Sequence, residues 1–207
     1  MAEIKSVGVV GAGQMGNGIA HVLALAGYKV LLHDVAPERI AAATDIIRKN
    51  LARQASKGAI KEADAERALA AISPAASLEA LADCDLVIES ATENQAIKKK
   101  IFSDLSKLMK KNALMATNTS SISITGLAAT TDRPDRFIGL HFMNPVPIMQ
   151  LVEVIRGIAT SRETFETAKA IIAKLGKTIA VSEDFPAFIV NRILLPMINE
   201  AIYTLHE

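Results

Sequence analysis

The sequence predicts an α/β fold with a doubly wound, mostly parallel sheet and helices on both of its faces. Three observations support this prediction. Short β-branched, apolar runs alternate with amphipathic segments of helix length along most of the chain. The first run leads directly into a glycine-rich turn, GAGQMG at 11–16, which a helical pattern follows. Half of the 207 residues are hydrophobic, so the chain can fill the two-sided core that such a sheet needs.

The first half of the chain is expected to supply strands at 5–11, 28–33, 85–91 and 113–118. Helices are expected directly after the glycine turn and at 37–54, 61–71, 95–109 and 122–128. Pro37 suits the first turn of its helix, because the N–H that proline lacks would have no helical partner there.

The stretch 137–156 predicts a strand, a proline-rich turn and a second strand. His141 ends the first strand and Glu153 lies inside the second. Because an unpaired buried carboxylate is costly, we expect Glu153 to pair with His141. A histidine held by a carboxylate is suited to abstracting a proton near neutral pH. The alternative is a structural histidine with a surface glutamate.

The last part of the chain predicts a helix at 160–175, a strand at 177–181 and an apolar helix at 188–205. Ser161 is expected to cap the first helix and Gly176 to end it. The last helix is apolar around most of its circumference, and Pro196 is expected to kink it or to limit its regularity. Such a helix must fold back, pair with another subunit or expose an aggregation-prone surface.

The glycine-rich turn stands between a strand and a helix, which is the context of a dinucleotide-binding site. Gly11 allows the tight turn, Gly13 lets the backbone approach a pyrophosphate, and Gly16 lets helix and strand pack closely. The helix that starts at Gln14 and Met15 offers free N–H groups to the anion. The alternative is a glycine-rich turn without a ligand.

Asp34 ends the second strand, where an acidic residue can accept hydrogen bonds from ribose hydroxyls. Its charge would repel a 2′-phosphate, so NAD is favoured over NADP. Arg39 lies nearby in the sequence and keeps NADP open as the alternative.

Polar residues follow three further strands. They are Glu89, Thr92, Glu93 and Asn94, then Asn118, Thr119, Ser120 and Ser121, then His141. Because ligands of such sheets bind outside the carboxyl ends of the strands, we expect these clusters to meet in one crevice with Asp34 and the glycine turn. The alternative is that loops are generally polar. Ser120 and His141 are harder to explain in that way, since each directly terminates an apolar strand.

Composition limits the function classes. The formal net charge of +1 gives no electrostatic reason to expect a nucleic-acid or membrane-surface partner. The single cysteine, Cys84, suits a reducing compartment, and neither a secretory signal nor a membrane-spanning run is visible. The sequence therefore predicts a cytoplasmic enzyme without a metal site.

The stretches VGVVGAGQMGNGIA, DLVIESATEN, ATNTSSISIT, RFIGLHFMNPVPIMQLVEVI and PAFIVNRILLPMINEA carry a resemblance. Together they make the chain similar to the N-terminal part of the L-3-hydroxyacyl-CoA dehydrogenase family, in particular to its bacterial 3-hydroxybutyryl-CoA members. The resemblance implies a Rossmann-like fold and hydride transfer between NAD and a 3-hydroxyacyl-CoA/3-oxoacyl-CoA pair. It implies acetoacetyl-CoA as the expected ketone substrate.

The resemblance also implies roles for individual residues. His141 would be the general base, Glu153 its orienting partner, and Ser120 a hydrogen-bond donor to the substrate's 3-oxygen. Asn191 would lie near the acyl thioester. The remaining implied NAD contacts are Asp34, Glu93, Lys98, Asn118 and Asn144, and the implied coenzyme A contacts are Asn50 and Lys57.

Family members continue into an all-helical domain, so the resemblance implies two parts: an NAD-binding domain at 1–184 and the first helix of a helical domain, cut short, at 185–207. It implies a homodimer, since that helical domain forms the dimer in the family. Ala187 stands where the family usually has glycine. Two alternatives remain: an NAD-binding fragment with little or no turnover, and a related short hydroxyacid dehydrogenase.

Overall fold

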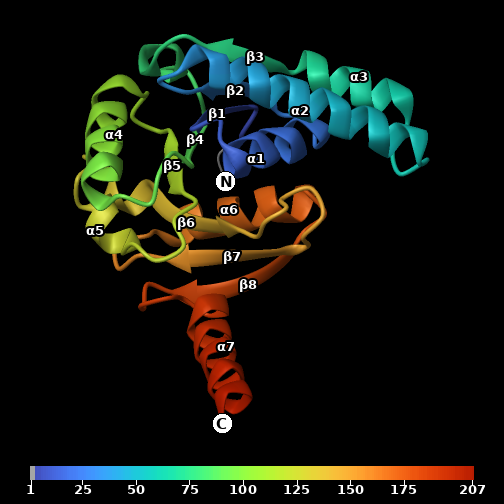
Figure 1. The fold of residues 1–207 in the computed structure, drawn as a ribbon. Coiled ribbons are helices and arrows are strands. Elements are labelled where there is room, and N and C mark those ends of the chain that lie inside the picture. The colour runs from blue at the N-terminus through green and yellow to red at the C-terminus, as the bar shows by residue number, and fades with distance from the viewer. Residues whose placement is uncertain (1–2) are drawn as a thin grey trace.

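The computed structural model describes residues 3–207 and contains one eight-stranded sheet (Figure 1). The strands are β1 (Ser6–Val10), β2 (Lys29–His33), β3 (Ile72–Ala75), β4 (Leu86–Glu89), β5 (Leu114–Thr117), β6 (Phe137–Phe142), β7 (Leu151–Arg156) and β8 (Thr178–Glu183). Their order across the sheet is β3-β2-β1-β4-β5-β6-β7-β8. Neighbouring strands are parallel except β6 and β7, which are antiparallel. The predicted doubly wound, mostly parallel sheet is confirmed.

Helices cover both faces of the sheet (Figure 1). They are α1 (Gln14–Leu25), α2 (Pro37–Ser56), α3 (Glu62–Ala70), α4 (Gln95–Leu108), α5 (Ile124–Ala128), α6 (Arg162–Lys174) and α7 (Val190–His206), with 3₁₀ turns at Leu78–Leu81 and Pro134–Arg136. One apolar core lies beneath α1, α2, α3 and α6, and a second beneath α4 and α5. Side chains of β4 alternate between them, since Leu86 and Ile88 join the first core and Val87 joins the second.

The local signals at helix ends are confirmed. Pro37 is in the first turn of α2, and the Ser161 side chain accepts the N–H of Thr164 at the start of α6. Gly176 follows α6 with a φ of 70°, the left-handed conformation that glycine adopts at low cost.

The structure adds one strand that the sequence did not predict, β3. Its sequence, Ile-Ser-Pro-Ala, contains a proline and only one large apolar residue. Proline is tolerated here because β3 lies at the edge of the sheet, where one side of the strand needs no ladder partner.

The segment after β8 differs from the prediction at the start of its helix. The last helix begins at Val190, after Ala187 and Phe188, which have positive φ values of 67° and 51°. Pro196 lies inside this helix, which projects away from the sheet (Figure 1). No residue of α7 is buried within the described chain, so the helix does not fold back on the sheet. No helix among residues 3–207 is long and apolar enough to cross a membrane.

Candidate active site

The glycine-rich turn has the shape that a dinucleotide requires. Gly11 has a φ of 100°, and a Cβ on it would lie 2.5 Å from the Ser90 carbonyl oxygen. A Cβ on Gly16 would lie 1.7 Å from the Gly11 carbonyl oxygen. Around Gly13, by contrast, no heavy atom beyond its own and those of its two chain neighbours lies within 4 Å of the position of a Cβ, so the space over the N-terminus of α1 is open. The turn is closed where strand and helix must pack and open where a pyrophosphate would bind.

Asp34 joins this turn to the end of β2. Its Oδ2 accepts the N–H of Ala12 at 2.9 Å and its Oδ1 accepts the N–H of Ala36 at 3.1 Å. The exposed guanidinium of Arg39 lies 3.9 Å from Oδ1. The carboxylate therefore has a structural role in the turn besides the contact with ribose expected from the sequence.

His141 and Glu153 lie directly opposite each other in the antiparallel ladder of β6 and β7. Their side chains share one face of the sheet, and His141 Nδ1 is 2.6 Å from Glu153 Oε2. Glu153 is fully buried and His141 is 6% exposed. The pair expected from the sequence therefore forms, and the register of two strands holds it.

Ser120 completes a line of polar groups on the other side of the imidazole. It lies in the loop between β5 and α5, and its Oγ is 3.0 Å from His141 Nε2. Because a carboxylate can only accept, the hydrogen between His141 and Glu153 belongs to Nδ1. Nε2 of the neutral ring is then free to accept the Ser120 hydroxyl, or a proton from a substrate.

The start of α7 contacts both ends of this line. Glu153 Oε1 accepts the N–H groups of Ile189 and Val190, each at 2.9 Å. Burial acts to raise the pKa of the Glu153 carboxyl, but the hydrogen bonds from His141 and from these two N–H groups outweigh it and hold the pKa below its usual value. Asn191 Nδ2 donates to the Ser120 carbonyl oxygen at 3.2 Å.

The segment before α7 is anchored at two further points. The Asp184 carboxylate accepts the Ser123 hydroxyl and the N–H groups of Ile124 and Thr125 within 2.9 Å, which fixes the loop after Ser120. Phe188 is 5% exposed, and its ring centroid lies 6.0 Å from that of His141. These contacts hold the segment against the face that carries the histidine.

Glu93 organises the backbone around Ser120. Its Oε1 accepts the N–H groups of Ser120 and Ser121 at 2.9 and 3.1 Å and the hydroxyls of Thr119 and Ser121 at 2.5 and 3.0 Å. Burial acts to raise the pKa of Glu93, but these donors and the nearby Lys98 ammonium hold it below its usual value. Lys98 itself is buried, and its Nζ lies 2.8 and 2.7 Å from the two carboxylate oxygens of Glu89.

Three hollows contain the other residues expected at the site. Met15, Glu93, Lys98, Asn118 and Ser120 line one of about 230 Å³. Gln14, Asn50 and Asn144 line a second of about 510 Å³, between the start of α1, α2 and the turn after β6. Asn50 also borders a third, of about 330 Å³, together with Lys57. The structure thus brings the expected residues to one edge of the sheet and to the adjoining face of α2.

Asn118 also connects two strands of this edge. Its Oδ1 accepts the N–H of Phe142 at 2.9 Å, and its own N–H donates to the Glu89 carbonyl oxygen at 2.8 Å. The residue therefore links the ends of β4, β5 and β6.

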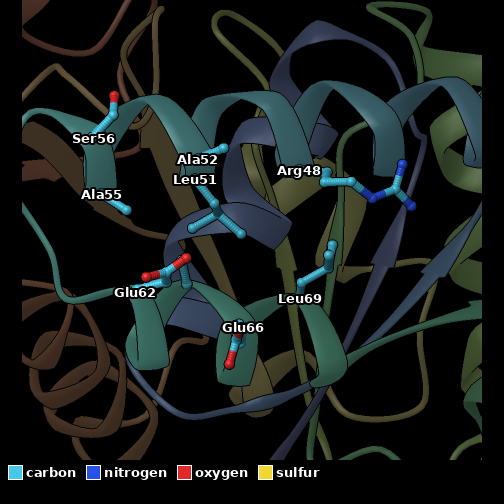
Figure 2. A pocket seen from close by; sticks show the side chains of 9 residues that line it. Arg48, Leu51, Ala52, Ala55, Ser56, Glu62, Glu66 and Leu69 are labelled. Carbon is cyan, nitrogen blue, oxygen red and sulfur yellow. The ribbon is translucent and has the colours of Figure 1, made fainter.

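A further hollow of about 360 Å³ lies on the other side of α2, between it and α3 (Figure 2). Leu51, Ala55 and Leu69 contribute apolar walls, with Arg48 and Glu66 beside them. None of the site residues expected from the sequence lines it. Within residues 3–207, no group of His, Cys, Asp and Glu side chains is arranged to hold a metal ion.

Two groups of site contacts were not expected from the sequence. The N–H groups of Ile189 and Val190 are backbone atoms, which carry no sequence signal. Glu89 was expected only as one of several polar residues near a strand end, whereas it is fully buried and pairs with Lys98. The available signal was its position, since it is the last residue of an apolar strand.

Comparisons with known proteins identify the family of this chain. The model of the 3-hydroxyacyl-CoA dehydrogenase NAD-binding domain matches residues 6–185. The chain is 64% identical over 206 residues to a 3-hydroxybutyryl-CoA dehydrogenase of Bradyrhizobium diazoefficiens, covering 100% of this chain and 70% of that protein. It is 49% identical to a probable 3-hydroxybutyryl-CoA dehydrogenase of Bacillus subtilis, covering 99% of this chain and 71% of that one. The crystal structure of (S)-3-hydroxybutyryl-CoA dehydrogenase from Ralstonia eutropha superposes with a TM-score of 0.95 at 46% identity, covering 99% of this chain and 72% of that one.

Proposed function

The chain belongs to the 3-hydroxyacyl-CoA dehydrogenase family, whose N-terminal domain binds NAD, and we propose that it interconverts 3-hydroxybutyryl-CoA and acetoacetyl-CoA with His141 as general base. The proposed substrate pair follows the names of the similar bacterial proteins. The reaction moves a hydride between NAD and the substrate's third carbon.

The observation that carries this proposal is the line formed by Ser120, His141 and Glu153. It lies at the edge of the sheet where β4, β5 and β6 end, together with the loops that follow them. The glycine-rich turn after β1 opens at the same edge, because β1 and β4 are parallel neighbours. A cofactor on the turn and a substrate on the histidine would therefore meet.

The chemistry requires a base that touches the substrate hydroxyl, because a secondary alcohol loses its proton as the hydride departs. His141 Nε2 would take this proton, while Glu153 holds the opposite N–H and stabilises the imidazolium that forms. Ser120 would donate its hydroxyl to the substrate oxygen and steady the charge that develops there. The bound NAD supplies the hydride-accepting carbon. In the reverse direction, protonated His141 would donate to the ketone.

The other site residues follow the family resemblance. We propose that the turn at 11–16 and Asp34 bind the NAD pyrophosphate and ribose, with further contacts from Glu93, Lys98, Asn118 and Asn144. Asn191 would lie near the acyl thioester, and Asn50 and Lys57 would contact coenzyme A. We also propose that residues 1–184 form the NAD-binding domain and that residues 185–207 form the first helix of a helical domain. A homodimer and a cytoplasmic location belong to the same proposal.

The deciding experiment follows NADH absorbance with acetoacetyl-CoA as substrate and acetoacetate as the matched control without coenzyme A. We expect oxidation of NADH with the thioester only. Turnover of the free acid but not the thioester would favour a short hydroxyacid dehydrogenase. Measured binding of NADH without turnover of either compound would favour a cofactor-binding fragment.

A further inference from the structure

Glu89 ends β4 as a fully buried carboxylate, and both of its side-chain oxygens accept hydrogen bonds. Oε1 accepts the N–H of Ala91 and the Lys98 ammonium, each at 2.8 Å. Oε2 accepts the same ammonium at 2.7 Å and the Thr117 hydroxyl at 2.8 Å. Removing a carboxylate and an ammonium from water costs free energy, so a buried ion pair of this kind is costly to form. The reaction proposed above gives Glu89 no role.

Two routes lead from Glu89 to the loop that holds Ser120. The first runs through Thr117, whose hydroxyl also accepts the N–H of Thr119 at 3.3 Å. The second runs through Lys98, which is 2% exposed and lies 3.7 Å from Glu93 Oε2. Glu93 in turn holds the N–H of Ser120 at 2.9 Å. The carboxylate is thus connected to two consecutive N–H groups of the loop, those of Thr119 and Ser120.

We propose that Glu89 is a positioning residue, which acts through Thr117 and the Lys98–Glu93 pair to hold Ser120 within hydrogen-bond distance of His141. The proposal rests on the proposed function, in which Ser120 and His141 share the reacting oxygen. A side chain displaced by about 1 Å from its productive position can lower a rate by roughly 10²-fold, so a fixed loop matters to turnover.

The test compares four variants of the whole chain: Glu89→Gln, Thr117→Val, Ser120→Ala and the double variant Glu89→Gln with Ser120→Ala. Glu89→Gln should lower kcat for acetoacetyl-CoA between roughly 10-fold and 10²-fold. In the Ser120→Ala background the same change should cost no more than about two-fold, because the residue through which Glu89 acts is gone. Equal losses in both backgrounds would overturn the proposal.

Asp85→Asn is the matched control. Asp85 precedes the same strand at its opposite end, and its carboxylate also pairs with a lysine, Lys110, and accepts the N–H groups of Lys5 and Ser6. We expect this change to lower the unfolding temperature without changing kcat. Thr117→Val removes the hydroxyl but should leave the ion pair of Glu89 and Lys98 in place. This variant therefore still tests the proposal if Glu89→Gln does not fold. A kcat that is unchanged in Thr117→Val, with Glu89→Gln unfolded, would also overturn the proposal.

A second measurement separates this proposal from the proposed function. The ¹⁵N resonance of His141 Nε2 senses the hydrogen bond from Ser120 whether or not the enzyme turns over. It should move in Glu89→Gln toward its position in Ser120→Ala, and stay in place in Asp85→Asn. A wild-type chain inactive on acetoacetyl-CoA would contradict the proposed function alone, whereas an unmoved resonance would contradict the positioning role alone.

Discussion

At the scale of single residues, Glu153 joins parts of the chain that are far apart in sequence. One of its oxygens holds the imidazole and the other holds the N-terminus of α7. Donors on both oxygens fix the rotation of the carboxylate, so it presents one oxygen to Nδ1 in a single orientation. The histidine ring therefore cannot turn without breaking a buried contact.

The first prediction concerns the effect of removing the general base, His141. His141→Gln should lower kcat by roughly 10²–10⁴-fold, because the substrate hydroxyl loses its proton acceptor. NADH affinity, measured by fluorescence titration, should remain near that of the unchanged chain, since the glycine turn is intact. Glu153→Gln should lower kcat less. Near-normal kcat/KM in His141→Gln would exclude the proposed mechanism.

Cofactor choice is the second prediction. Asp34 should repel the 2′-phosphate of NADPH, so the unchanged chain should prefer NADH. Asp34→Ser should weaken NADH binding and narrow the preference, as initial rates with both cofactors would show. Because Asp34 also holds the N–H groups of Ala12 and Ala36, some loss of stability should accompany the change. Equal rates with both cofactors before mutation would contradict the assigned role.

His21 gives a prediction about stability and pH. Burial, aided by the Lys177 charge, lowers the pKa of His21 to about 4 in spite of a hydrogen bond with Gln54. The unfolded chain therefore binds more protons than the folded one between pH 6.5 and 4, and stability falls as the pH falls through this window. From pH 7 to pH 5 this residue should cost about 2 kcal/mol.

Urea unfolding at pH 7 and pH 5 measures this difference. His21→Gln should remove most of it, and His206→Gln, at an exposed position, should leave it unchanged. An equal difference in all three proteins would show that other groups are responsible.

At the scale of elements, the pair of strands β6 and β7 could be predicted from the sequence. The strand, turn and strand at 137–156 follow from apolar runs and prolines, and two inward side chains on neighbouring strands follow from burial. The pairing of His141 with Glu153 could therefore be predicted from the sequence. The glycine-rich turn could be predicted because a strand pattern precedes it and a helical pattern follows it.

Other elements could not be predicted because their stability comes from contacts distant in sequence. The strand β3 exists because β2 offers it a parallel edge, which its own four residues do not reveal. The positive φ values at Ala187 and Phe188 occur in a segment that contacts of Asp184, Glu153 and the Phe188 ring hold in place, and these contacts are distant in sequence. For Glu89, the position at the end of an apolar strand was a signal, but it does not identify Lys98, nine residues later, as the partner.

Ala187 yields a prediction at this scale. Its φ of 67° strains any residue with a Cβ, so Ala187→Gly should raise the free energy of unfolding by up to about 1 kcal/mol. The matched control is Ala41→Gly in the exposed face of α2, which should lower it by a similar amount. Denaturant unfolding of both variants decides the question. Equal destabilisation by both changes would show that the strain at Ala187 is absent in solution.

At the scale of the whole molecule, α7 is the exposed part of a well-packed protein. Apolar side chains including Ile193, Leu195, Met197, Ile202 and Leu205 are more than half exposed. A contiguous apolar surface of this kind favours association. The 207-residue chain should therefore form a dimer or larger oligomer through α7.

Sedimentation at roughly 10–50 μM protein, a concentration at which weak interfaces form, measures the oligomeric state of the chain and so tests this prediction. A chain without residues 185–207 should be monomeric and should still bind NADH through the glycine turn and Asp34. A monomeric 207-residue chain would contradict the expected association. Loss of NADH binding in the shortened chain would contradict the independence of the cofactor site.

The placement of His141 and Glu153 within one ladder also bears on how the protein should respond to heat. Both residues are in strands whose backbone amides are paired and whose neighbours are core residues, so local opening cannot expose one without disrupting the sheet. Their amide hydrogens should exchange with solvent only when the whole domain opens, whereas those of the loop around Ser120 exchange sooner. On warming, the hydrogen bond between His141 and Glu153 should thus remain intact until the domain unfolds cooperatively, and should be lost in that transition.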